Sequence, residues 1–96
     1  AMIAEGLRGL GRIQDVHTIM SGLFDAAQGE ADFRLPELFC GFDRTRSSKP
    51  IDYPVSCSPQ AWAAGSIYQL LAACINFRPD ALNGRLAIVE PCLPEW

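Results

Sequence analysis

The chain has 96 residues, of which 49% are apolar, so it holds one domain at most and is globular, not disordered. Eleven acidic against eight basic side chains give a net charge of −3, which argues against a nucleic-acid binder and a polybasic membrane-surface segment. No apolar run approaches the roughly 20 residues that cross a bilayer, and no charged-then-apolar signal sequence opens the chain. We therefore expect a cytoplasmic protein with no membrane or nucleic-acid partner.

Two helices are predicted in the first third of the chain. Ala1 precedes Met2 and is interpreted as an expression scar, and residues 2–9 are typical of the last turns of a helix. Residues 12–28 carry apolar side chains three and four positions apart, which form one stripe on a helix that ends at Gly29. The members of this stripe are Ile13, Val16, Met20, Leu23, Phe24 and Ala27. His17 lies next to the stripe, and we expect it to be partly buried and hydrogen-bonded.

The middle of the chain, residues 29–58, has no sustained helical or alternating period and is predicted to be a long irregular loop. Loops longer than about 12–15 residues are usually functional or disordered. Apolar residues at both ends of this loop predict that it is held at its ends. Its polar part, residues 43–49, is predicted to be a solvated tip that contains Arg44, Arg46 and Lys49.

The third predicted helix is 59–75, with Ser58 as its N-cap and Pro59 at its first position. Apolar groups surround nearly the whole helix, which predicts burial on several sides. The remaining tail, 76–96, has a turn signal at Asn83-Gly84 and a short extended stretch around residues 86–89. Two long helices are a thin core for this much apolar surface. The chain therefore either oligomerises or is part of a larger helical domain.

The four cysteines, Cys40, Cys57, Cys74 and Cys92, are 17 or 18 positions apart and form no close pair. Structural zinc sites usually bring their ligands in close pairs, so no metal site is expected. Buried free thiols are the favoured interpretation, and a redox or metal module is kept as an alternative.

Two motifs carry a resemblance to a known family. Leu-Pro-Glu-Leu-Phe-Cys-Gly at 35–41 is followed by Cys-Ser-Pro-Gln-Ala-Trp-Ala at 57–63. Together they resemble the C-terminal part of the amylo-α-1,6-glucosidase (glycogen debranching enzyme) family, and more broadly the glycoside hydrolases built on an (α/α)6 toroid. The resemblance runs over most of residues 10–96 and implies an all-α fold. Residues 2–96 would then be one C-terminal fragment of a glycosidase catalytic domain, acting on an α-glucan without a cofactor and packing against the remainder of the toroid.

The resemblance implies that Glu37 is the general base of an inverting mechanism, which needs two carboxyl groups. It also implies that Gln60 and Trp62, together with Tyr53 on the loop, contact the sugar. Simpler interpretations remain for each: Glu37 as a solvated loop carboxylate, Gln60 as a helix cap and Trp62 as a packing residue. No residue in 1–36 matches the family's general acid, so the fragment alone is expected to be inactive. The alternative is a small helical module without catalysis that forms a homodimer through exposed apolar helix faces.

Overall fold

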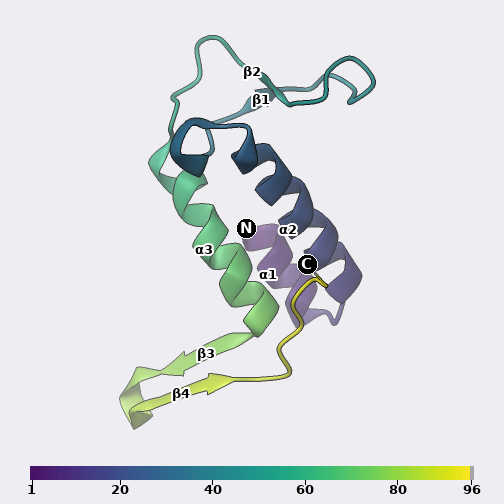
Figure 1. The fold of residues 1–96 in the computed structure, drawn as a ribbon. Coiled ribbons are helices and arrows are strands. Elements are labelled where there is room, and N and C mark those ends of the chain that lie inside the picture. Colours follow the sequence, from purple (N-terminus) through teal and green to yellow (C-terminus); the bar gives the residue numbers. More distant parts are fainter. Residues whose placement is uncertain (96) are drawn as a thin grey trace.

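The computed structural model describes residues 1–95 and contains three helices and two small antiparallel sheets (Figure 1). The helices are α1 (Met2–Gly9), α2 (Ile13–Gln28) and α3 (Ala61–Ile75), and each packs against the other two. A 3-10 turn, Ala31–Phe33, follows α2. The strands are β1 (Phe39–Cys40), β2 (Ile51–Asp52), β3 (Phe77–Asp80) and β4 (Arg85–Ile88). The predicted helices 2–9 and 12–28 are confirmed to within one residue.

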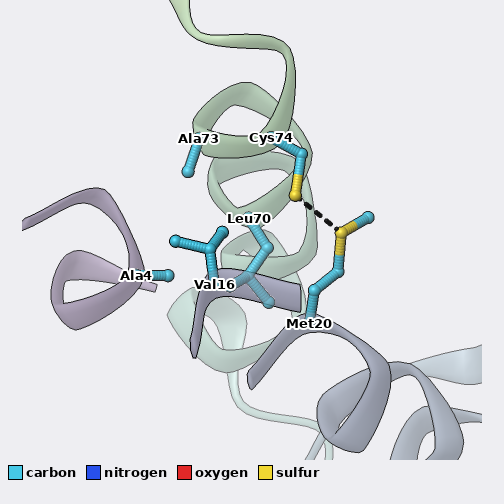
Figure 2. Close-up of a cluster of buried hydrophobic side chains, with 6 residues drawn as sticks. All are labelled: Ala4, Val16, Met20, Leu70, Ala73 and Cys74. Atoms are coloured by element: carbon cyan, nitrogen blue, oxygen red, sulfur yellow. Dashed lines mark hydrogen bonds between the residues drawn. The ribbon is translucent and has the colours of Figure 1, made fainter. Parts of the chain in front are cut away.

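The core lies where the three helices meet. It is formed by the buried residues Ala4, Val16, Met20, Leu70, Ala73 and Cys74. The apolar spacing of α2 predicted this contribution, because positions three and four apart lie on one face of a helix. Figure 2 shows the Cys74 thiol pointing at the thioether of Met20, with Sγ and Sδ 3.0 Å apart. Burial raises the pKa of Cys74 above its usual value, with a smaller contribution from Cys92 and an opposing one from Arg8.

The prediction of an all-α part of an (α/α)6 toroid is wrong for the described chain, because two β-hairpins occupy segments that were assigned to the loop and the tail. In the loop 29–58, β1 pairs with β2 in the register Phe39↔Asp52 and Cys40↔Ile51. In the tail 76–96, β3 pairs with β4 from Phe77↔Ile88 to Asp80↔Arg85. Figure 1 shows the two hairpins at opposite ends of the helices.

The β3–β4 hairpin forms because its turn residues satisfy the backbone locally. The Asp80 carboxylate accepts hydrogen bonds from the backbone and side-chain nitrogens of Asn83, at 3.3 and 2.7 Å. Gly84 then adopts a positive φ of 60°, which costs glycine little. Pro79 lies within β3, where it is tolerated because a strand in a two-stranded sheet has one free edge.

The start of α3 also differs from the prediction. The helix begins at Ala61, and Gln60, in an extended conformation, is its N-cap, in place of Ser58. The reason is that the Gln60 N–H donates to the carbonyl of Leu35 (3.1 Å), while the Gln60 carbonyl accepts the first helical bond, from Ala64 (2.8 Å). The helix ends as predicted at Ile75, where Asn76 adopts a left-handed conformation.

The chain after β4 returns to the helices and is held there by polar contacts. Arg8 donates to the carbonyls of Val89 and Glu90 and to the Cys92 sulfur. His17 Nε2 lies 3.0 Å from the Cys92 carbonyl oxygen, and the Cys92 N–H donates to the Cys74 carbonyl at 2.9 Å. The expectation that His17 is half-buried and hydrogen-bonded is confirmed.

Candidate functional site

The segment before Glu37 is fixed by apolar packing. Leu35 is 3% exposed and packs in a second buried cluster with Ala26 and Ala27 from the end of α2. Ala63 of α3 packs against the same cluster. Pro36 is buried as well and restricts the backbone next to it. The side chain of Glu37 therefore follows an anchored pair of residues, although it is itself exposed.

Glu37 is also connected to the second motif by hydrogen bonds. Its N–H donates to the Cys57 carbonyl at 2.8 Å, and its Oε2 accepts from the Cys57 N–H at 3.2 Å. With the bond from Gln60 N–H to the Leu35 carbonyl, three hydrogen bonds join residues 35–37 to residues 57–60. We call this arrangement the motif junction. One oxygen of Glu37 thus has a fixed donor, and Oε1 makes no hydrogen bond within residues 1–95.

The other predicted site residues are placed differently relative to the motif junction. The half-buried Gln60 belongs to it through its backbone, and its side chain makes no capping hydrogen bond. Trp62, in the first turn of α3, is 79% exposed, so the packing interpretation does not hold for the described chain. Tyr53 is 46% exposed and opens a turn in which its carbonyl accepts from the Ser56 N–H at 3.0 Å. Among the described residues, no hydrogen bond joins Tyr53 or Trp62 to Glu37.

Sequence reasoning missed a groove next to the motif junction. It has a volume of about 410 Å³ and lies between the end of α2 and the chain from Cys40 to Ile51. None of Glu37, Tyr53, Gln60 and Trp62 lines it. The predicted solvated tip supplies much of its wall, including Arg44 and Lys49. No sequence signal indicated the groove, because its two walls, residues 25–29 and residues 40–51, meet only in the fold.

Two carboxyl groups lie close together near this groove. Glu30 follows α2, and Asp52 ends β2. Partial burial raises the pKa of Glu30 above 4.5, the nearby Asp52 carboxylate raises it further, and Lys49 opposes the change. Sequence reasoning did not identify this pair, because the residues are 22 positions apart and meet only through the loop.

The cysteines are all free, but only Cys74 is buried, so the expectation of four buried thiols is wrong for the other three. Cys57 is exposed, and Cys40 and Cys92 are half-buried. Within residues 1–95, no group of three or more His, Cys, Asp or Glu side chains is arranged to hold a metal ion. The described helices include none that is both long and apolar enough to span a bilayer.

Comparison of the chain with protein-family models, with curated proteins and with solved structures finds no match. The functional assignment therefore depends on the residues and their geometry.

Proposed function

We propose that this chain is the C-terminal part of a glycoside hydrolase similar to the amylo-α-1,6-glucosidases, and that Glu37 is its general base. The observation that supports the proposal best is the motif junction. Two motifs 22 positions apart, each weak alone, are joined by three hydrogen bonds, and the Glu37 carboxylate accepts one of them. The bond from the Cys57 N–H connects the Glu37 carboxylate to the second motif, 20 positions away in the chain.

The proposed reaction hydrolyses a glycosidic bond with inversion at the anomeric carbon. Glu37 accepts a proton from a water molecule while the water oxygen bonds to the anomeric carbon. An acid elsewhere in the protein protonates the glycosidic oxygen as its bond to that carbon breaks. The two carboxyl groups in such enzymes are about 6.5–9.5 Å apart, which leaves room for the water. The Cys57 N–H orients Oε2 and leaves Oε1 to accept the proton. Fixed orientation of this kind favours general-base catalysis. No cofactor takes part.

The proposal assigns the general acid to a segment outside this chain. The 96 residues alone are therefore expected to bind the glucan but not to hydrolyse it. Gln60, Trp62 and Tyr53 are proposed to contact the sugar. An exposed indole next to the motif junction suits the C–H face of a pyranose ring, and the unpaired Gln60 amide suits its hydroxyl groups. An α-1,6-linked glucan is the proposed substrate. Four free thiols are typical of a reducing compartment, which supports a cytoplasmic location.

The experiment that tests this proposal measures glucan hydrolysis by the longer protein in which this chain is joined to the segment with the acid. Glu37→Gln keeps the size of the side chain and removes its basicity. General-base catalysis contributes about 10²–10⁴-fold, so kcat is expected to fall by about that factor while KM changes little. Glu95→Gln, at another exposed carboxylate, is the matched control. Activity of Glu37→Gln near that of the control would show that the assignment is wrong.

The second candidate, a non-catalytic helical module that forms a homodimer, is favoured by apolar side chains that α3 leaves exposed. Trp62, Tyr68 (77% exposed) and Leu71 leave part of α3 apolar and uncovered in the described chain. In the main proposal Trp62 contacts the sugar, and the rest of the catalytic domain covers Tyr68 and Leu71. Sedimentation equilibrium of the chain separates the two. A tight dimer that Trp62→Ala and Tyr68→Ala dissociate supports the module, and a monomer at high concentration contradicts it.

A further inference from the structure

The groove between the end of α2 and the chain from Cys40 to Ile51 is not used by the proposed mechanism. Its volume of about 410 Å³ falls within the range of small-molecule sites, about 300–1,000 Å³. It lies at the same end of the helices as the β1–β2 hairpin (Figure 1). Leu35, two residues before Glu37, packs on Ala26, which also lines the groove. The groove and the motif junction therefore share a wall.

The charges in the groove indicate what kind of ligand fits. Asp25 and Asp43 contribute two carboxylates, and Arg44 and Lys49 contribute two cations. The Glu30 and Asp52 carboxyls lie close together beside the groove, and the Lys49 charge acts on Glu30. A site with balanced charge gives no net attraction to an anion or a cation. The four charges of the lining thus select neither an anion nor a cation, and a neutral ligand suits them.

The hydrogen-bonding groups of the groove divide into two sets. Asp43 and Ser47 are used by the loop itself, since their side-chain oxygens accept from the Thr45 and Lys49 N–H groups, each at 3.2 Å. The side chains of Asp25, Gln28, Arg44 and Ser48 make no hydrogen bond or ion pair within residues 1–95. These four side chains include both hydrogen-bond donors and acceptors, and a ligand with many hydroxyl groups can pair with both kinds.

The lining also contains an exposed aromatic ring. Phe42 is 56% exposed at the groove, and Ile51 adds apolar surface beside it. An exposed phenyl face next to unpaired polar groups matches a pyranose ring, which has an apolar face and polar edges.

We propose that this groove binds a short neutral oligosaccharide, a glucan arm that extends from the bond cleaved at Glu37. The reading of the ligand as a glucan arm depends on the proposed function, whereas its neutral, polyhydroxylated chemistry comes from the groove. Residues 25–29 at the end of α2 form one wall, and residues 40–51 form the other. Gly29 lies where the first wall comes close to Lys49 of the second, because a methyl group at its Cβ position would lie 3.6 Å from Lys49 Cδ and 3.3 Å from the Ala26 carbonyl oxygen.

The experiment titrates the isotopically labelled 96-residue chain with maltotriose and isomaltotriose and records amide chemical shifts. Shift changes are expected at residues 25–29 and 42–49. Gln28→Ala and Phe42→Ala are each expected to weaken binding by about tenfold, as the loss of one good contact does. Gln14→Ala removes the same amide from the exposed start of α2 and is the matched control. Ser48→Trp, which fills the groove, is expected to abolish the shift changes at 42–49.

The outcomes separate this inference from the proposed function. Absence of binding, binding unchanged in Gln28→Ala and Ser48→Trp, or equally strong binding of citrate would overturn the neutral-sugar groove. Shift changes confined to Glu37, Cys57 and Gln60 would also overturn it and leave the proposed function in place. Saccharide binding in the groove together with full hydrolysis by the Glu37→Gln enzyme would support the groove and overturn the assignment of the base.

Discussion

Leu35 connects the fold to the candidate site, and its truncation has a calculable effect. Leu35→Ala removes three carbon atoms from a side chain that is 3% exposed. At about 0.8 kcal/mol for each buried methylene the transfer loss is about 2.4 kcal/mol, and a residual cavity adds to it. The neighbouring loop relaxes into part of that cavity, so we expect a total loss of about 2–3 kcal/mol. In a domain of this size that lowers Tm by about 10–20 °C.

Leu38→Ala is the matched control, because the same side chain three residues later is 43% exposed. Its expected cost is about 0.5–1 kcal/mol. The assay is thermal and urea unfolding followed by circular dichroism, with amide exchange at the Glu37 N–H, which bonds the Cys57 carbonyl. Leu35→Ala is expected to accelerate that exchange more than Leu38→Ala does. Equal loss of Tm in the two variants would refute the view that Leu35 anchors the motif junction.

Two further predictions concern titratable groups. Because burial and Asp52 raise the pKa of Glu30, the folded state holds the Glu30 proton more tightly than the unfolded state does. The protonated Glu30 therefore adds to the free energy of unfolding at low pH, and this stabilisation is lost as the pH rises past 4.5. Glu30→Gln is therefore expected to raise the urea midpoint at neutral pH and to change it less below pH 4.5, and an equal gain at both would contradict the reasoning. Alkylation followed by peptide mapping is expected to modify the exposed Cys57 first and the buried Cys74 only on unfolding, whereas early modification of Cys74 would contradict its packing against Met20.

The helices were predictable because their signals are local. The stripe from Ile13 to Ala27 has a spacing that only a helix brings to one face, and α2 follows it. The α3 pattern located the helix but not its first residue. The sequence favours Ser58 as a cap, but the Gln60 backbone bonds with Leu35, a partner 25 positions away, and this bond decides where the helix starts.

The β1–β2 hairpin was missed because its strands are short and carry no alternation of apolar and polar residues. β1 and β2 have two residues each, and the ten residues between them are mostly polar. In the tail the Asn83-Gly84 turn and the extended stretch after it were predicted, and β4 confirms that stretch, but Pro79 concealed the strand before the turn. Pairing between such strands depends on contacts across the loop, which no local pattern records.

The sequence motifs supplied candidate site residues, whose roles stay predictions, but they did not supply the geometry of the site. The motifs identified Glu37 and Gln60, and the structure adds that the Cys57 backbone, not its thiol, contacts Glu37. A contact made by the backbone N–H cannot be predicted from the residue type, because nearly every residue has this group. The groove was missed for a related reason, since its polar groups match those of any solvated loop.

The most direct test of the central claim is chemical rescue at Glu37 in the longer protein. Glu37→Ala removes the base and leaves space for a small anion beside the Cys57 N–H. We expect hydrolysis of an α-1,6-linked glucan to fall by about 10²–10⁴-fold and azide to restore turnover as an inverted glycosyl azide, because azide attacks the anomeric carbon without a base. A Glu37→Ala enzyme that hydrolyses the glucan at the unchanged rate, or an inactive one that forms no glycosyl azide, would contradict the assignment of Glu37 as the base.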